Sequence, residues 1–198
     1  MSPARARTSG TSIVAAARAL LEEGGLDAVT MQAVADRVGV RAPSLYKHVT
    51  GRPALIGAIA DDVVAELDLQ LLPALRTNDP AEAVRIACVN YRSFARRSPG
   101  AYQLLFSRLL PQARPTAESN AAGAAGVLLI AERLVGPARA LETARLCTAF
   151  IHGFVSMELA GAFRLGGDVD AAFSSGIETI LRGSRAGPTA EPGAGRVR

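Results

Sequence analysis

Apolar side chains recur at helical spacing along nearly the whole chain. The first stripe contains Ile13, Ala17 and Leu20 and ends at a pair of glycines. A second stripe begins after Thr30, which is a predicted N-cap, and ends at Gly39. No stretch of useful length alternates between apolar and polar residues, as a half-buried strand does. The pattern therefore predicts an all-helical (all-α) protein.

Prolines and glycines divide the rest of the pattern into further helices. A short third helix is followed by longer ones, and Pro73 is expected to end the fourth because proline breaks the helical hydrogen-bond ladder. Residues 111–115 are expected to form a loop. The predicted ranges, in chain order, are 42–49, 53–72, 80–97, 99–109, 116–135, 137–165 and 168–182.

Composition narrows the class of protein. The chain has 198 residues, of which 49% are hydrophobic and 20% are charged, which is typical of a folded soluble protein. Its longest small or apolar run, 121–131, is too short to span a bilayer, and no signal segment opens the chain. Cys88 and Cys147 stand far apart, which argues against a zinc site or a disulfide framework. We expect a cytoplasmic protein without metal or cofactor.

Positive charge is concentrated in the first quarter of the chain. The net charge is +4, and residues 1–52 contain seven basic and four acidic side chains. The remaining 146 residues contain fifteen basic and fourteen acidic side chains. A basic N-terminal module on a nearly neutral body indicates a polyanionic partner.

Residues 30–49 have the spacing of a helix-turn-helix motif, with two short helices joined at Gly39. In this motif the second helix lies in the major groove, and its first residues reach base edges. Arg41, Ala42 and Ser44 are suited to that contact. The polar side chains suited to backbone phosphates are Tyr46, Lys47, His48 and Arg52. A solvated helix face is the alternative that this pattern leaves open.

The segment VTMQAVADRVGVRAPSLYKHVTGRPAL resembles the N-terminal DNA-binding domain of the tetracycline-repressor (TetR) family. The similarity covers about residues 10–60 and implies a three-helix DNA-binding domain. The base-reading residues that it implies are Gln32, Arg41, Ala42, Pro43 and Ser44. The phosphate-holding residues that it implies are Thr30, Tyr46, Lys47, His48 and Arg52. Position 52 is usually lysine in this family, and position 41 often carries a small capping residue.

Two later segments, YRSFARRSPGAYQLLF and FIHGFVSMELAGAF, resemble the C-terminal domain of one subset of TetR-like regulators. The resemblance implies a helical body that binds a ligand and forms a dimer. The predicted organisation is a DNA-binding domain over 10–52, a helical body over 53–183, and a disordered tail over 184–198.

The predicted function is a sequence-specific transcriptional regulator, most simply a repressor released from a palindromic operator by a small molecule. A ligand pocket is expected to be mainly apolar with a few polar groups. The residues predicted to line it are Tyr91, Phe94, Tyr102, Phe106, Phe150, His152, Phe154 and Met157. Ordinary core packing is the alternative for each of them.

A two-fold homodimer is predicted through 137–165 and 168–182. These segments carry more large apolar side chains than packing within one chain needs, and they contain small residues that allow helices to approach closely. The small residues are Gly153, Ala160, Gly161 and Gly176. We expect the long fourth helix to transmit ligand binding to the two DNA-binding domains.

Two other classes of function are alternatives to a ligand-responsive regulator. An enzyme would need a nucleophile with its base, a metal cluster or a phosphate loop, and the sequence offers no catalytic constellation of this kind. An architectural DNA-binding protein without a ligand is the stronger alternative. A sequence-specific footprint that a small molecule abolishes distinguishes a ligand-responsive regulator from it.

Overall fold

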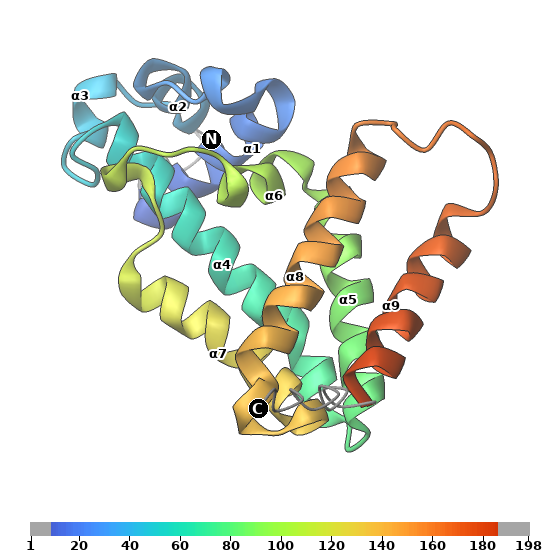
Figure 1. Cartoon of the computed structure of the whole chain (residues 1–198). Coiled ribbons are helices and arrows are strands. Elements are labelled where there is room, and N and C mark those ends of the chain that lie inside the picture. Colours follow the sequence, from blue (N-terminus) through green and yellow to red (C-terminus); the bar gives the residue numbers. More distant parts are fainter. Residues whose placement is uncertain (1–8, 186–198) are drawn as a thin grey trace, which may run out of the picture. The chain divides into compact units, whose positions relative to one another are not determined.

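The computed structural model describes residues 9–185, which fold into α-helices and one short 3-10 turn, η1 (Figure 1). The all-helical prediction is thereby confirmed. The helices are α1 Gly10–Ala28, α2 Met31–Val38, α3 Ala42–Leu45, α4 Arg52–Arg76, α5 Pro80–Arg97, α6 Pro99–Phe106, α7 Ala117–Val135, α8 Pro137–Leu159 and α9 Val169–Arg185, and η1 is Pro111–Ala113. The predicted tail lies outside the described residues, except for its first two, which continue α9.

The described residues belong to two compact units. The first unit comprises the chain up to Leu72 together with Val89–Gly126, and the second comprises Pro73–Cys88 together with the chain from Val127 onward. Helices α4, α5 and α7 each contribute to both units. Compactness alone does not define domains, so the division into 10–52 and 53–183 stays a prediction.

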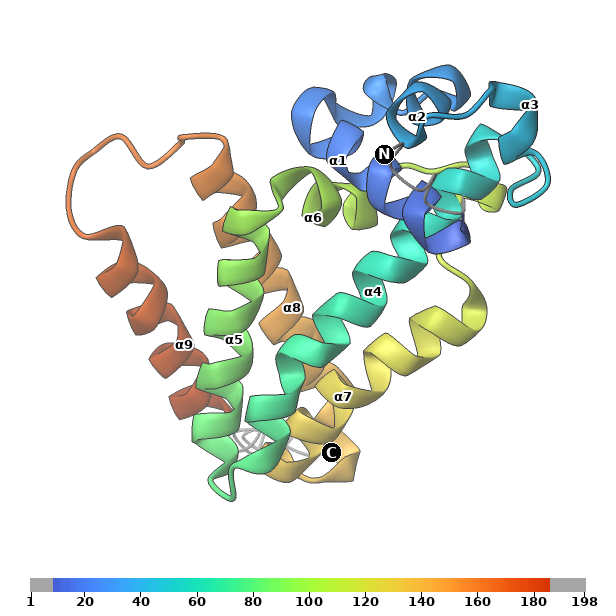
Figure 2. The same cartoon turned by 180° about the vertical axis from the view of Figure 1, so that it is seen from behind.

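The N-terminal helices share a small apolar core within the first unit. Ile13 of α1, Val34 of α2, Leu45 of α3 and Leu55 of α4 are completely buried. Each is the inward member of an amphipathic pattern, and burying such a side chain contributes about 1.5–3 kcal/mol. We call α1, α2 and α3 the head; both views show its helices gathered beside the first turns of α4 (Figures 1 and 2).

Two glycines of α7 allow it to pack closely on α4 within the first unit. A Cβ atom at Gly123 would lie 2.7 Å from Val64, and one at Gly126 would lie 2.9 Å from Leu71. Real side chains do not approach so closely, so a larger residue at either position would force the side chain of Val64 or Leu71 to move.

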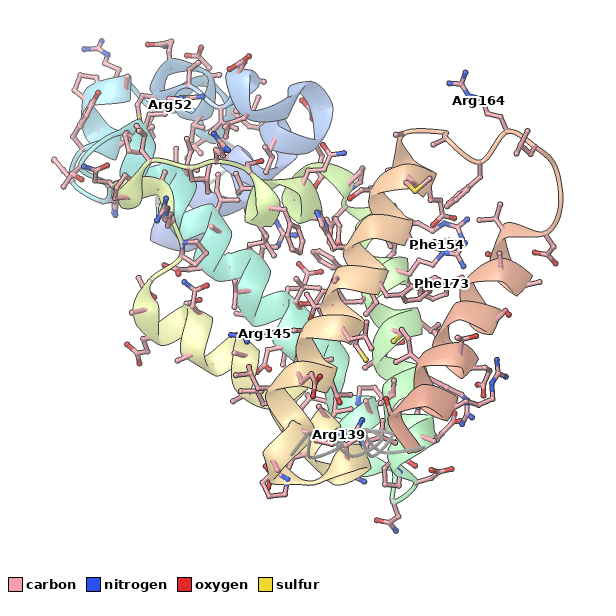
Figure 3. The ribbon with its side chains drawn as sticks, viewed as in Figure 1. Arg52, Arg139, Arg145, Phe154, Arg164 and Phe173 are labelled. Atoms are coloured by element: carbon pink, nitrogen blue, oxygen red, sulfur yellow. The ribbon has the colours of Figure 1, made fainter. Side chains whose placement is uncertain are left out.

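In the second unit α8 and α9 run antiparallel and are joined by a long loop (Figure 1). Phe173 of α9 stacks on Phe150 of α8 at 5.6 Å between ring centroids, and it meets Phe154 edge-on at 5.0 Å. Phe154 and Phe173 point toward each other between the two helices (Figure 3). Phe163 in the loop extends this aromatic cluster.

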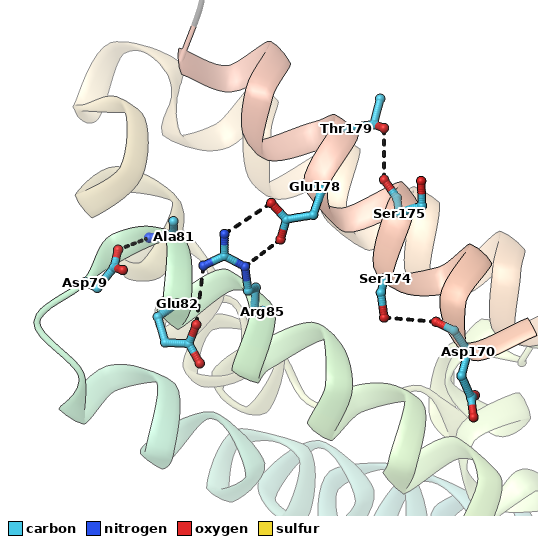
Figure 4. A network of polar contacts seen from close by, with 9 residues as sticks. All are labelled: Asp79, Ala81, Glu82, Arg85, Asp170, Ser174, Ser175, Glu178 and Thr179. Carbon is cyan, nitrogen blue, oxygen red and sulfur yellow. Dashed lines mark hydrogen bonds and ion pairs between the residues drawn. The ribbon is translucent and has the colours of Figure 1, made fainter.

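A polar network ties α5 to α9 (Figure 4). Arg85 donates to both carboxylate oxygens of Glu178, at 2.6 and 3.2 Å, and also reaches Glu82. Asp79 caps α5, because its carboxylate accepts a hydrogen bond from the N–H of Ala81 at 2.9 Å. Thus the start of α5 is fixed at its own N-terminus and against α9.

We expect Gly176→Ala to lower the free energy of unfolding by about 1–3 kcal/mol, the usual cost of overfilling a packed core. A Cβ atom at Gly176 would overlap the ring of Phe150. Gly183→Ala is the matched control in the same helix, because nothing surrounds that position, and it should leave stability equal or slightly higher. Urea denaturation followed by circular dichroism measures both, and equal stabilities would contradict this packing.

Gly161 and Gly176, two of the small residues named for the predicted dimer interface, each have a role within their own chain, and the dimer itself stays a prediction. Gly176 accommodates Phe150 of its own chain. Gly161 follows the end of α8 with a φ of 63°, and the N–H groups of Gly161 and Ala162 donate to Glu158 and Met157. This is a glycine cap, which ends α8 six residues before the predicted 165.

Other predicted helix ends also shift. α4 continues through Pro73 to Arg76, although proline was expected to end it. α6 ends at Phe106 rather than at 109, and α9 continues beyond Gly183. Ser184 is buried in that last turn, and its carbonyl accepts a hydrogen bond from Arg139, which holds the helix together past the glycine.

Three negative observations concern residues 9–185. No single helix there is long and apolar enough to cross a membrane; α7 and α8 reach that length only as a bent pair. No group of three or more His, Cys, Asp or Glu side chains is placed to hold a metal ion. Cys88 and Cys147 are free thiols, and burial raises the pKa of Cys88.

Candidate nucleic-acid interface

Local hydrogen bonds define the turn between α2 and α3. The Thr30 side chain caps α2 by accepting from the N–H of Ala33 at 3.1 Å, as predicted. At the other end Gly39 takes a φ of 77°, and the N–H of Val40 donates to Ala35 at 2.9 Å. This glycine cap turns the chain sharply, so that α3 follows α2 after three residues and packs against it.

α3 is shorter than predicted. Its regular part ends at Leu45, whose carbonyl accepts from the N–H groups of both His48 and Val49, at 2.8 and 3.0 Å. This shared acceptor continues the helix only as a turn. Leu45 itself is completely buried, which anchors the segment and leaves its neighbours on the surface.

The structure brings most of the predicted DNA-binding residues onto the surface of α2 and α3. The exposed ones are Thr30, Gln32, Arg41, Pro43, Tyr46, Lys47 and His48. Ala42 and Ser44 are half-buried at the start of α3. Because Leu45 points inward, the cationic and polar side chains around it can reach a polyanion without unfolding the head.

Gln32 has a partner within α2. Its amide donates to the carboxylate of Asp36 at 2.7 Å. A side chain held in this way is ordered on the surface, and it must exchange this bond when it contacts a base edge. Sequence spacing gives a hint of the pair, since residues four apart share a helix face.

An ion pair fixes α2 against α1. Arg37 donates to both oxygens of the Glu23 carboxylate, at 2.7 and 2.6 Å. These hydrogen bonds hold the pKa of Glu23 below its ordinary value. Exposed pairs of this kind contribute little to stability, but the two-point geometry sets the angle between the helices.

Arg52 has a different environment from the one expected for a phosphate contact. Its Nε donates to the carbonyl of Val29 and its Nη2 to the carbonyl of Leu26, both at 2.7 Å. The side chain is half-buried and closes the end of α1 against the start of α4 (Figure 3). Carbonyls at a helix C-terminus lack intrahelical donors, and arginine is suited to satisfy two at once.

We expect Arg52→Ala to lower the free energy of unfolding by about 2 kcal/mol, because two carbonyls lose charged donors. The free energy of unfolding of Arg52→Lys should lie between those of the wild type and Arg52→Ala, since lysine keeps a cation but not the planar two-point geometry. Denaturant unfolding measures both variants. A phosphate contact predicts the opposite: unchanged stability with a weaker salt dependence of DNA binding.

The eight residues predicted to line a ligand pocket fall into two groups. Tyr91, Phe94, Tyr102 and Phe106 belong to the first unit, and Phe150, His152, Phe154 and Met157 to the second. Phe94 and Tyr102 are buried, and Tyr102 packs edge-on against Tyr91 at 6.5 Å. His152 lies 3.4 Å from the Ser156 hydroxyl. Ring packing within each unit accounts for most of these side chains, and a pocket role stays a prediction.

A surface groove of about 560 Å³ runs between α4 and the first turns of α7, within the first unit. Its size is in the range of small-molecule sites. None of the eight predicted residues lines it. Its lining residues are Asp61, Val64, Ala65, Asp68, Leu69, Thr116, Glu118, Ser119, Ala122 and Gly123.

A contact between α1 and α6 was not predicted. Glu22 accepts hydrogen bonds from the N–H groups of Gly100 and Ala101, at 2.9 and 2.8 Å. The residues lie more than seventy positions apart, so no local sequence signal reveals the pair. Ser98, at the N-cap of α6, makes no capping hydrogen bond with its own side chain, and Glu22 supplies the acceptor instead.

Both the N-terminal helices and the C-terminal part of the chain are similar to known protein families. Residues 13–59 match the family described as bacterial regulatory proteins, tetR family, and residues 84–180 match a tetracyclin repressor-like C-terminal domain. An uncharacterised HTH-type transcriptional regulator of Mycobacterium tuberculosis is 30% identical over 90% of this chain and 82% of its own. The class D tetracycline repressor of Escherichia coli is 35% identical over 46% of this chain and 44% of its own.

Solved structures share the same fold. A protein of unknown function from Rhodococcus sp. RHA1 superposes with a TM-score of 0.77 at 22% identity, covering 92% of this chain and 98% of that one. A TetR variant from Acinetobacter baumannii in complex with minocycline superposes with a TM-score of 0.69 at 24% identity, covering 93% of this chain and 100% of that one. At these identities the likeness is one of fold.

Proposed function

Because the chain belongs to the TetR family of transcriptional regulators, we propose that it is a repressor that a small-molecule ligand releases from a palindromic DNA operator. The family consists of DNA-binding regulators and not of enzymes. The observation that carries the proposal is the exposed, basic surface that Arg41, Lys47 and His48 form on either side of α3, which buried Leu45 anchors beside α2. A DNA partner also places the chain in the cytoplasm.

Within this proposal the head divides its contacts by chemistry. Arg41, Ala42, Pro43 and Ser44 at the start of α3 read base edges, with Gln32 of α2 beside them. Thr30, Tyr46, Lys47 and His48 hold phosphates, because they are exposed at the start of α2 and in the turn after α3. Arg52 positions α4 rather than holding phosphate, since its half-buried guanidinium is turned toward the carbonyls of Val29 and Leu26.

The proposed regulator is a homodimer through 137–165 and 168–182. An exposed stripe with helical spacing runs along α8 through Leu146, Ala149, Gly153 and Met157. Leu146 is 51% exposed and Met157 49%, and Leu141 adds another exposed apolar side chain. Small and large apolar residues on one unpartnered face support a self-complementary contact with a second copy.

The ligand is proposed to bind in the helical body. The minocycline complex shows that a TetR protein of this fold binds a small molecule, and this chain offers aromatic side chains and a groove of suitable size. Moving α4 would then change the distance between two heads.

Selection from random DNA tests the proposed function directly. Fragments enriched by the purified full chain should contain two inverted half-sites with centres about 34–36 Å apart, or a multiple of that distance. Footprinting on such a fragment, repeated with a library of small molecules, then tests release. Enrichment of no sequence over random DNA would refute the proposal, whereas a footprint that no compound removes would favour an architectural protein.

A further inference from the structure

We propose that Glu22 is the positioning residue through which the helical body sets the orientation of the head on DNA. This inference rests on the proposed function. Glu22 lies on α1 and holds the N-terminus of α6, and both helices belong to the first unit. Its carboxylate is therefore a direct link between the DNA-binding helices and the segment that follows α5.

The link uses every free donor at the start of α6. Pro99, the first residue of this helix, has no N–H, and the N–H of Tyr102 donates to Ser98 at 3.0 Å. Only Gly100 and Ala101 remain, and both donate to Glu22. Charged hydrogen bonds at a helix N-terminus are also favoured by the helix dipole.

The contact is close enough to transmit small movements. A Cβ atom at Gly100 would lie 2.9 Å from the carbonyl oxygen of Leu21 and 3.1 Å from the Glu22 carboxylate. Leu21 is buried, and Ala101 is completely buried. The backbone of Gly100 therefore lies directly against the backbone of Leu21, beside the Glu22 carboxylate, and a shift of α6 strains this contact and the two hydrogen bonds.

α6 also carries residues predicted to contact a ligand. Tyr102 is buried, and its ring lies 5.1 Å from that of Phe106 at the other end of this helix. A molecule that displaces either ring acts on a helix of eight residues whose start is held by Glu22. The regulated quantity is thus the orientation of α1 rather than the folding of the head.

Glu23 provides a matched control one residue away. It also makes two hydrogen bonds to its partner, Arg37, but that partner lies within the head. Losing Glu23 loosens the head internally, whereas losing Glu22 releases the head from α6. Gly100→Ala disturbs the same contact from the side of the body.

The test measures affinity for a series of operators, built from the fragment that the wild-type chain selects, with the half-sites moved apart or together by single base pairs. We expect Glu22→Ala to bind the best operator about tenfold more weakly, a typical coupling strength, and to discriminate less between spacings. The affinity of Glu22→Gln, which keeps one acceptor oxygen, should lie between those of the wild type and Glu22→Ala. Gly100→Ala should resemble Glu22→Ala in affinity and in spacing discrimination. Glu23→Ala should keep the wild-type spacing profile.

Two results overturn the inference while leaving the proposed function intact. One is a Glu22→Ala protein with wild-type affinity and spacing profile. The other is an equal loss at every spacing, which indicates a weakened head rather than a released one. If the wild-type chain selects no operator, the proposed function fails and this inference falls with it. Circular dichroism of each variant confirms that the compared proteins are folded.

Discussion

Replacing both Leu146 and Met157 with glutamate should give a folded, helical monomer that binds the selected operator at least about a thousandfold more weakly. The two residues lie eleven positions apart, on one exposed face of α8. Four carboxylates would then meet across a two-fold interface that is otherwise apolar. A single head keeps little more than the non-specific affinity, which is typically a thousandfold or more below that of a specific dimer.

Sedimentation velocity at micromolar concentration measures the oligomeric state, and titration of labelled operator measures binding. Leu129→Glu is the control, because Leu129 is equally exposed, at 48%, but lies on α7 outside the proposed interface. It should remain dimeric. A double variant that sediments as a dimer, or a wild-type chain that sediments as a monomer, would place the interface elsewhere or remove it.

Lys47→Ala and Ser44→Ala should separate affinity from sequence preference. Lys47 is exposed and carries a charge without a base-reading geometry, so its loss should weaken binding to operator and random DNA by the same factor. The slope of log K against log salt should fall by about one for each head. Ser44, at the start of α3, should instead change discrimination at one base pair by about 1–3 kcal/mol and leave the slope unchanged.

Lys47→Arg controls for the charge and should restore the slope. Binding is measured at several salt concentrations on the selected operator, on single-base variants of it and on random DNA. A Lys47→Ala protein with altered base preference, or a Ser44→Ala protein with uniformly weaker binding, would show that the phosphate-holding and base-reading roles are assigned to the wrong residues.

Local chemistry made the helix-turn-helix predictable. Thr30 caps α2 through its own hydroxyl, and Gly39 ends it in a conformation that glycine adopts readily. Both ends of α2 are therefore determined by residues at those ends, which the sequence shows directly. The end of α3 was not predictable in this way. The Leu45 carbonyl accepts from the N–H groups of both His48 and Val49, so two hydrogen-bond patterns are nearly equivalent there. Sequence periodicity does not distinguish a last helical turn from a tightened one.

Long-range partners account for most of what was missed. Arg52 is basic and lies beside the DNA-binding helices, and only the structure shows its guanidinium facing the carbonyls of Leu26 and Val29. Gly176 is small and lies on a predicted interface helix, but the ring that needs the space is Phe150, on the preceding helix. Composition identifies residues suited to a role, whereas tertiary contacts decide which role they take.

Pro73 gives α4 a mechanical property that its length alone would not. The helix continues through this residue, but proline has no N–H to donate to the carbonyl of Leu69, one turn earlier. The ladder is intact from Arg52 to Leu72, so this part acts as a stiff arm about 30 Å long with its weakest point at one end. A rotation of about 5° at Pro73 displaces the other end by about 3 Å, the length of a hydrogen bond between a side chain and a base.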